Sequence, residues 1–342
     1  MKILVDAMGG DNAPLEIVKG AVMAAAEYEV DIVLVGVVEE ILKAIEDLGL
    51  KELPKGIEVQ EAKEVIAMDE AASDAVARKP DASVAVGLRM LNEGSGAALV
   101  SAGSTGVLLM GASQIVGRIS GIRRAAMAPI MPNGKDGVVL IDCGANVDCK
   151  PEDLLEFALM GSYYATAVLG KENPRVGLLN IGTEASKGDA LRREAYQLIK
   201  SAGDRLNFVG NVEAREALAD SVDVVVADGF SGNILLKAIE GTAYFVSKQL
   251  KERVFFRNNR SKLAAGMLKS GLDEFKALLN PSEYGGTALL GIARPVIKAH
   301  GNSEAYAIRS AIRQAMAFAS SGIISGIEEN IETIKADGSR GE

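Results

Sequence analysis

Residues 97–106 have the sequence Ala-Ala-Leu-Val-Ser-Ala-Gly-Ser-Thr-Gly, in which an apolar run ends in a loop of small polar residues and glycine. The run is short and uncharged, as expected of a strand that is buried on both faces. A helix is predicted to follow it over Thr105–Val116. The stretch therefore predicts a strand, a glycine loop and a helix in succession, which is the repeating unit of α/β folds.

The same alternation of apolar runs and helix-like segments extends on both sides of this stretch. The predicted strands are Ile3–Val5, Ile32–Val35, Ile57–Val59, Ala97–Val100, Val138–Ile141, Val176–Leu179 and Val222–Ala227. The predicted helices are Pro14–Tyr28, Val38–Leu48, Asp69–Arg78, Ser83–Asn92, Thr105–Val116, Pro151–Leu169 and Lys187–Ser201. This rhythm predicts a mainly parallel sheet with helices on both faces.

The pattern changes after Gly229, where long helical segments replace the alternation. Helices are predicted over Gly232–Val254 and Ser261–Leu279, then a turn-rich stretch around Pro281–Gly286 and a last helix over about Ser303–Ala319. We expect one α/β catalytic domain over residues 1–335. Its helical subdomain, at about 232–280, would project from the core, and residues 336–342 would form a frayed tail.

Composition restricts the classes of function. The formal charge of −9 disfavours nucleic-acid binding, which depends on basic surface. The two cysteines, Cys143 and Cys149, are too few for a disulfide framework. The first residues do not have the pattern of a signal peptide, so we expect a cytoplasmic protein. Residues 94–117 are uncharged, but their six glycines and several hydroxyl side chains favour a buried strand, loop and helix over a membrane span.

Common catalytic and cofactor motifs are absent from the sequence. It contains no G-x-G-x-x-G after the first strand, no P-loop, no H-E-x-x-H and no G-x-S-x-G. Cys143 and Cys149 have no histidine nearby, so no metal site is expected. With a single histidine, His300, a mechanism without a covalent enzyme intermediate is easier to support.

The Ser101–Gly106 loop has the composition of a phosphate site. Glycines expose backbone N–H groups, and serine and threonine add hydroxyl donors. The candidate phosphate-binding residues in it are Ser101, Gly103, Ser104, Thr105 and Gly106. A plain helix cap is the simpler alternative, because Ser and Thr favour that position.

Further polar loops follow other predicted strands. They are Asp6–Pro14, Asp142–Asn146, Asn180–Gly188, Gly210–Glu213 and Asp228–Asn233. Since the carboxyl ends of parallel strands meet at one edge of a sheet, such loops together indicate a lined cleft. Turns and caps made by Asn and Asp would explain many of the same residues.

The segment Lys248–Lys269 carries seven basic residues and one acidic residue in a chain of net negative charge. Apolar side chains, among them Phe255 and Phe256, lie between the charges. A basic amphipathic helix can bind anionic membranes or acidic proteins. The simpler alternative is an ordinary helix whose charged face is solvated and binds nothing. The candidate docking residues are Lys251, Arg253, Phe255, Phe256, Arg257, Arg260 and Lys262.

Several segments of the sequence, spread over about residues 1–325, together resemble the bacterial phosphate acyltransferases. The resemblance is carried by Asp6–Pro14, Ser101–Gly106, Asp142–Lys150, Phe157–Gly161, Gly177–Gly182 with Lys187-Gly188, Asn207–Asn211 and Asp228–Asn233. Members commonly have Arg-Pro-Ala where this chain has Arg124-Ala-Ala126, so the arginine is kept and the proline is not.

The resemblance implies a Rossmann-like three-layer α/β/α sandwich similar to phosphate acetyltransferase and isopropylmalate dehydrogenase. It implies transfer of a long-chain fatty acyl group from acyl carrier protein to inorganic phosphate, which gives acyl phosphate for glycerophospholipid synthesis. It also implies a homodimer, no cofactor, and peripheral contact with the cytoplasmic membrane and the glycerol-3-phosphate acyltransferase.

For that reaction, the Ser101–Gly106 loop would bind phosphate, with Arg124 or Lys187 balancing its charge. Asp6 or Asp228 would orient the phosphate proton or act as base, and His300 would protonate the leaving thiolate unless it is only structural. The oxyanion donor is expected among Asn146, Asn180, Asn211 and Asn233. The alternatives are a short-chain acyl-coenzyme A enzyme, a dehydrogenase of related fold and a membrane-surface scaffold.

Overall fold

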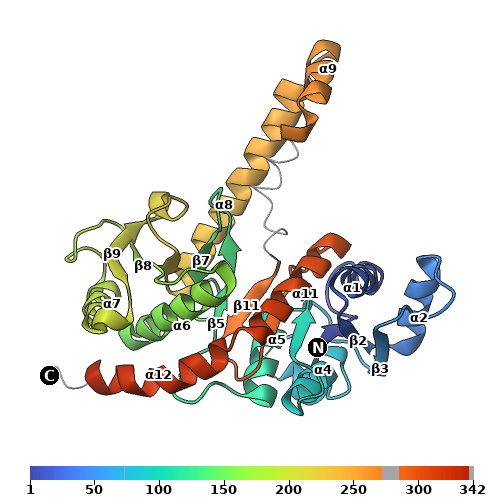
Figure 1. Cartoon of the computed structure of the whole chain (residues 1–342), viewed down its shortest axis with the longest axis horizontal. Helices are drawn as coiled ribbons and strands as arrows, with labels where there is room; N and C mark the ends of the chain where they lie inside the picture. The colour runs from blue at the N-terminus through green and yellow to red at the C-terminus, as the bar shows by residue number, and fades with distance from the viewer. Residues whose placement is uncertain (73, 272–284, 339–342) are drawn as a thin grey trace.

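The computed structural model of the chain describes residues 1–72, 74–271 and 285–338. Within them, two sheets lie side by side with helices around them (Figure 1). The first sheet has the strand order β3-β2-β1-β4-β12-β11-β5, and the second has the order β6-β7-β10-β8-β9. Most neighbours are parallel; β11 runs antiparallel to β12 and β5, and β6 runs antiparallel to β7.

The strands of the first sheet are β1 Lys2–Asp6, β2 Asp31–Gly36, β3 Ile57–Glu61, β4 Ala98–Ser101, β5 Ala126–Ala128, β11 Thr287–Leu290 and β12 Val296–Lys298. Those of the second are β6 Ile130–Met131, β7 Val138–Ile141, β8 Val176–Asn180, β9 Phe208–Glu213 and β10 Val224–Val226. All seven predicted strands are present. The mainly parallel α/β fold is therefore confirmed, although the sequence did not predict β5, β6, β9, β11 or β12.

The α-helices are α1 Leu15–Tyr28, α2 Val38–Asp47, α3 Ala75–Arg78, α4 Ser83–Asn92, α5 Thr105–Gly111, α6 Pro151–Leu169, α7 Ala190–Ser201, α8 Gly229–Gln249, α9 Asn259–Met267, α11 Ala305–Ser320 and α12 Ile323–Gly338. Single π-helical turns, Ala112–Val116 and Leu250–Phe255, extend α5 and α8. Short 3-10 turns occur at Gly203–Arg205 and Ala214–Glu216.

Two predictions for the helices were inaccurate. The helix expected over Asp69–Arg78 forms only at Ala75–Arg78, and α12 follows the segment that was expected to be the last helix. Residues 336–338 of the expected tail belong to α12. Residues 339–342, the end of the predicted Ser261–Leu279 helix and most of the turn-rich stretch around 281–286 lie outside the described residues.

Side chains on both faces of the strands are buried, which explains why the strands are apolar throughout. On β1, Ile3 and Val5 belong to one hydrophobic cluster and Leu4 to another. On β7, Val139 and Ile141 belong to the first cluster and Leu140 to the second. Each cluster thus includes residues of both sheets, with the helices covering the outer faces.

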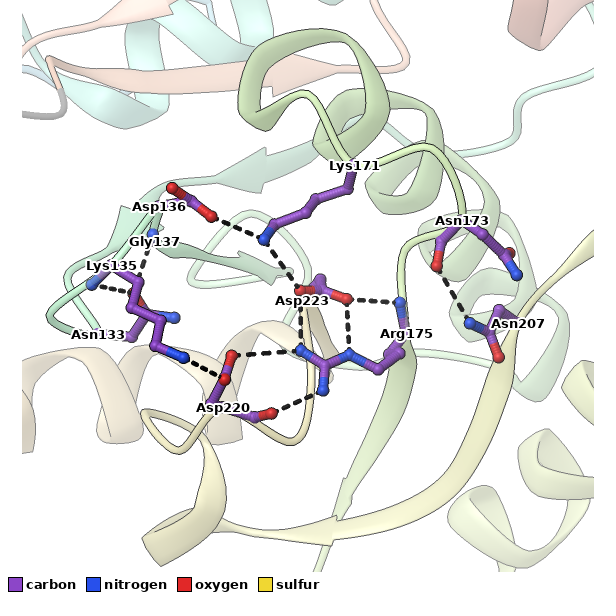
Figure 2. Close-up of polar contacts among 10 residues, drawn as sticks. All are labelled: Asn133, Lys135, Asp136, Gly137, Lys171, Asn173, Arg175, Asn207, Asp220 and Asp223. Carbon is purple, nitrogen blue, oxygen red and sulfur yellow. Dashed lines mark hydrogen bonds and ion pairs between the residues drawn. The ribbon is translucent and has the colours of Figure 1, made fainter.

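An ion-pair network fixes the amino-terminal ends of β8 and β10 (Figure 2). Asp223 accepts hydrogen bonds from Arg175 Nε at 2.9 Å and from the Arg175 backbone N–H at 2.8 Å. Lys171 Nζ lies 3.8 Å from the same carboxylate, and Arg175 also donates to the backbone oxygen of Asp220. The network ties the loop before β10 to the loop before β8, at the edge opposite the strand-end loops.

The helices α8 and α9 project from the body of the molecule (Figure 1). Several large apolar side chains on them are exposed, for example Phe245 at 61% and Phe256 at 54%. Most of α8 and all of α9 overlap the segment at about 232–280 for which a helical subdomain was expected. No helix in the described part of the chain has both the length and the apolar character that a membrane crossing requires.

Candidate active site

Three polar residues end neighbouring strands of the first sheet in one row. Asp6 of β1 is the register partner of Ser101 of β4, and Ser101 is the partner of Lys298 of β12. All three are buried, with exposures of 2%, 1% and 6%. The sequence predicted Asp6 and Ser101 at strand ends, and the structure brings them together.

Asp6 and Ser101 form the centre of this row. The Ser101 hydroxyl donates to Asp6 Oδ2 at 2.6 Å, and Ser101 Oγ accepts from the Gly103 N–H at 3.1 Å. Burial raises the pKa of the Asp6 carboxyl, and hydrogen bonds from Ser101, Ser83 and two backbone N–H groups partly offset this rise. The carboxylate thus orients the serine, and the serine orients the first glycine of the loop.

Lys298 is the member of the row that sequence analysis missed. Its Nζ donates to the backbone oxygen of Ala102 at 3.3 Å and to that of Ala299. Burial lowers the pKa of Lys298 to about 8, against the opposing effect of the charges on Asp6 and Asp11. The one local signal was a charged residue at the end of an apolar run, Val296-Ile-Lys298, in a region assigned to no strand.

Glycines allow the loops after these strands to interlock. A Cβ on Gly9 would lie 2.7 Å from the Gly103 nitrogen, and one on Gly10 would lie 2.9 Å from the Gly301 oxygen. These distances are too short for any side chain, so glycine is required here. Beneath the loops, Asp6, Ser83, Ser101 and Ser104 line a cavity of about 10 Å³, which has room for about one water molecule.

The outer part of the predicted phosphate loop is open to ligands. Ser104, Thr105 and Gly106 are partly exposed, whereas Ser101 and Gly103 are buried beneath them. Solvent therefore reaches the outer side of the loop, and Ser101 and Gly103 lie behind it. His300 is exposed in the loop after β12, which meets the first loop through a hydrogen bond from Asp11 N–H to Gly301 O at 2.7 Å.

Loops at the carboxyl edge of the second sheet are held mainly by their own side chains. The buried carboxylate of Asp142 accepts hydrogen bonds from four backbone N–H groups, including that of Asn146 at 2.7 Å. The side-chain amide of Asn146 donates to Ala125 O at 2.8 Å and to Asp142 at 3.0 Å. Asn146 therefore positions the loop, and both its amide hydrogens have partners.

Two more of the predicted asparagines have structural contacts. Asn180 Nδ2 donates to the Lys187 backbone oxygen at 3.1 Å, and Asn211 Nδ2 donates to the Glu184 oxygen at 2.8 Å. Both asparagines thereby hold the loop after β8, in which the side chain of Lys187 is exposed. Asn211 Oδ1 is buried and has no hydrogen-bond partner within the part of the chain that the structure describes.

Asp228 and Asn233 differ in how free their side chains are. Asp228 Oδ1 caps α8 by accepting from the Ser231 N–H at 2.9 Å, and its Oδ2 pairs with Arg192. Arg192 in turn also contacts Asp189 and the Ser231 hydroxyl. Asn233, in the second turn of α8, is exposed.

The structure does not place Arg124 beside the Ser101–Gly106 loop. Arg124 precedes β5, whose first residue, Ala126, pairs with Leu290 at the end of β11. The start of β11, at Thr287, pairs with Lys298 beside the loop. Arg124 therefore lies at the opposite edge of the first sheet from the loop. Its guanidinium donates to Asp148 O at 3.0 Å and lies 3.6 Å from the Asp153 carboxylate.

The predicted docking residues lie at the far end of α8, in the π-helical turn and in α9. Lys251, Arg253, Phe256, Arg257, Arg260 and Lys262 are exposed, and Phe255 is partly exposed. Cys143 and Cys149 are free thiols, and burial raises the pKa of Cys149 to about 12. No group of three or more His, Cys, Asp and Glu side chains that could hold a metal ion occurs in the described residues.

Solved structures of similar fold identify the class of architecture. A phosphotransacetylase from Streptococcus pyogenes matches with a TM-score of 0.64 at 20% identity, over 93% of this chain and 94% of that one. A 4-hydroxythreonine-4-phosphate dehydrogenase from Salmonella typhimurium matches with a TM-score of 0.52 at 12% identity, over 93% and 98%. The chain therefore has the Rossmann-like α/β fold that these enzymes share.

Sequence relatives identify the family. A family model described as "Fatty acid synthesis protein" matches residues 1–326. Phosphate acyltransferases of Thermotoga maritima and Thermoanaerobacterium thermosaccharolyticum are 46% and 45% identical, over 99% and 98% of this chain and equal shares of their own lengths. The chain belongs to this phosphate acyltransferase family, and it is an enzyme of the acyltransferase class.

Proposed function

We propose that the protein transfers a long-chain fatty acyl group from acyl carrier protein to inorganic phosphate. The products would be acyl phosphate, used in glycerophospholipid synthesis, and the free thiol of the carrier. Family membership supports the reaction class. The single structural observation that carries the proposal is the buried Asp6–Ser101–Lys298 row, which fixes a glycine loop at the carboxyl edge of the first sheet.

The chemistry requires little more than positioning and charge stabilisation. A phosphate oxygen attacks the thioester carbonyl, a C–O bond forms, and the C–S bond breaks as the tetrahedral intermediate collapses. The thiolate that leaves takes up a proton. Hydrogen phosphate is already nucleophilic near neutral pH, so preorganised donors can supply most of the rate enhancement.

Phosphate is proposed to bind on the outer side of the Ser101–Gly106 loop, which the buried Asp6 fixes from behind through Ser101. Of the two cations proposed to balance its charge, Lys187 has an exposed side chain. Arg124 would first have to leave Asp153, from which it lies 3.6 Å away. Lys187 has the freer side chain of the two. It follows β8 at the edge where the second sheet meets Ala125, however, so neither cation lies beside the Ser101–Gly106 loop.

Asn233 has the freest side chain of the four asparagines proposed as oxyanion donors, but it lies against the Asp142–Asn146 loop and not beside the Ser101–Gly106 loop. The amide nitrogens of Asn146, Asn180 and Asn211 already donate to backbone oxygens. Asn233 is exposed in the second turn of α8, where its amide can turn toward a ligand. Asp228 is held by Arg192 and by its own helix, and Asp6 is buried behind Ser101, so neither carboxylate faces the outer side of the loop.

His300 is proposed to protonate the leaving thiolate, since it is exposed next to the buried row. The measurement is the turnover number of a His300→Gln enzyme. A tenfold or greater loss at saturating substrates would support the role. Normal turnover would show that His300 has no catalytic role and that solvent protonates the thiolate.

The basic segment 248–269 is proposed to dock the acidic carrier protein and the cytoplasmic membrane, and to bring the enzyme near the glycerol-3-phosphate acyltransferase. A homodimer that requires no cofactor is proposed on the same family grounds. The enzyme would be cytoplasmic and peripherally membrane-associated. Its exposed cations and apolar side chains on α8 and α9 support the docking role.

A comparison of donors at equal concentration tests the proposed substrate. We expect phosphate-dependent acyl phosphate formation from palmitoyl-acyl carrier protein, with much slower formation from acetyl-coenzyme A. Faster reaction of acetyl-coenzyme A would identify a short-chain enzyme. Binding of nicotinamide nucleotide with a divalent metal would favour a dehydrogenase, and a lack of any phosphate dependence would favour a scaffold.

A further inference from the structure

We propose that Lys298 is a positioning residue of the phosphate site, which keeps Asp6 ionised and fixes the turn at Ala102 and Gly103. The inference rests on the proposed function, because it assigns Lys298 to the site where phosphate would bind. It begins from the strand register, which sets Asp6, Ser101 and Lys298 side by side across β1, β4 and β12.

The ammonium group of Lys298 is buried without a direct ion pair. Its Nζ donates to the oxygens of Ala102 and Ala299, and within the described residues no carboxylate forms an ion pair with it. A buried cation is costly unless nearby negative charge offsets it. The charged groups that face it are Asp6 on β1 and Asp11 in the following loop, while the neighbouring His300 is exposed.

A series of hydrogen bonds connects Lys298 and Asp6 to the loop. Lys298 favours the ionised form of Asp6, and ionised Asp6 accepts the Ser101 hydroxyl proton at 2.6 Å. Ser101 Oγ then accepts from the Gly103 N–H at 3.1 Å, while Lys298 itself binds the preceding carbonyl of Ala102. Both ends of the Ala102–Gly103 turn thus depend on the same buried pair of charges.

The pair also predicts how activity responds to pH. Because burial lowers the pKa of Lys298 to about 8, the ammonium would lose its proton in mildly alkaline solution. The donor that holds the Ala102 carbonyl and the positive charge that faces Asp6 would then both be lost, and the turn at Ala102 and Gly103 would loosen. An alkaline decline in kcat with a midpoint near pH 8 is expected in the wild-type enzyme.

Coupling between the two charges can be measured without any assay of activity. Thermal melting of Asp6→Asn, Lys298→Met and the double variant forms a double-mutant cycle. We expect the double variant to lose less in Tm than the sum of the two single losses, since each single change leaves the other charge buried and unpaired. Strictly additive losses would overturn the coupling, even if the protein proved not to be an acyltransferase.

Kinetics then test the role in the reaction. We expect Lys298→Met to lower kcat at pH 7 at least tenfold with a KM for palmitoyl-acyl carrier protein within twofold of wild type. Lys298→Arg should retain activity and lose the decline near pH 8, since arginine stays charged. Lys135→Met, which removes an exposed lysine at the far edge of the second sheet, is the matched control and should behave as wild type.

The kinetic outcomes separate the two claims. Wild-type enzyme that forms no acyl phosphate would refute the proposed function alone, and the melting cycle would still decide the coupling. An active wild type with an unchanged profile in folded Lys298→Met would overturn the positioning role. If Lys298→Met does not fold, Lys298→Arg decides: an alkaline decline that keeps its wild-type midpoint assigns the titration to another group and overturns the proposal.

Discussion

The Ser101 hydroxyl donates to Asp6 Oδ2 at 2.6 Å, across neighbouring strands that are 95 residues apart in the chain. This bond explains why a serine ends β4 at that position. Without it, one buried carboxylate oxygen would lose its donor, and the Gly103 N–H would lose its acceptor. The contact joins the first loop of the chain to the candidate phosphate loop.

Replacing Ser101 by alanine should lower both stability and activity. Leaving buried polar groups without partners costs about 1–3 kcal/mol. We expect a free energy of unfolding lower by about 2 kcal/mol, and at least a tenfold loss in kcat with a smaller change in the KM for the acyl donor. Denaturant unfolding and steady-state kinetics check this, with the exposed Ser201→Ala as control; equal behaviour of the two variants would refute it.

The ion pair between Asp223 and Arg175 should contribute stability that depends on pH. Burial alone would raise the pKa of Asp223, but the hydrogen bonds and charge of Arg175 outweigh it and lower the pKa below its usual 3.8. A lowered pKa in the folded state means that the contribution is full above the unfolded value and is lost as pH falls through the folded value.

We therefore expect Asp223→Asn to lower the free energy of unfolding by about 2 kcal/mol near pH 7. The substitution removes the buried carboxylate that pairs with the partly exposed Arg175. The difference from wild type should shrink as the pH falls below about 4. Urea unfolding at several pH values measures it. A difference that stays constant down to pH 3 would contradict the assignment.

The start of α8 should not tolerate a methyl group at Gly232. A Cβ there would lie 1.9 Å from the Asp142 backbone oxygen, so the helix must move away from the Asp142–Asn146 loop. Gly232→Ala should cost about 3 kcal/mol through overpacking. In the same helix, Gly241→Ala meets open space and should stabilise by up to about 1 kcal/mol through helix propensity.

Calorimetric melting of the two glycine variants provides the comparison. Because both substitutions add the same atom to one helix, helix propensity alone would shift their Tm values equally. Opposite shifts would show that the close contact of α8 with the loop decides the result. Equal stabilisation by both would show that α8 is not held against Asp142.

Salt should weaken the docking of the carrier protein if the basic segment binds it. The KM for palmitoyl-acyl carrier protein is expected to rise severalfold between low and physiological ionic strength, because exposed charges are screened. Arg253→Glu with Arg257→Glu should raise this KM at low salt and remove most of its salt dependence. Lys51→Glu with Lys55→Glu, exposed cations in another region, is the control; equal effects of the two pairs would argue against a specific surface.

The fold was predictable where single segments carried a strong pattern. Val138–Ile141 is apolar without interruption, and Pro151–Leu169 has Pro151 in its first turn and Gly170 just after its last residue, where the chain adopts φ 67°. By contrast, β5 is only Ala-Met-Ala, and it is a strand because β11, from the far end of the sequence, pairs with it. Pairing between distant segments leaves no local pattern.

Site residues were likewise predictable only where they follow a strand with a strong local pattern. Asp6 and Ser101 follow strong strands and were predicted at the sheet edge, whereas Lys298 depends on β12 inserting between β4 and β11. Arg124 shows the opposite difficulty, since a conspicuous cation near the right motifs proved to contact Asp153 at the other edge of the sheet. Partners of that kind are set by tertiary packing, which the sequence pattern does not contain.

The most direct test of the central claim is acyl phosphate formation from palmitoyl-acyl carrier protein, followed with and without inorganic phosphate and with no added nucleotide or metal. We predict product that depends on phosphate and falls at least tenfold in Ser101→Ala. Release of free carrier thiol at the same rate without phosphate, or no product from this donor at all, would contradict the account.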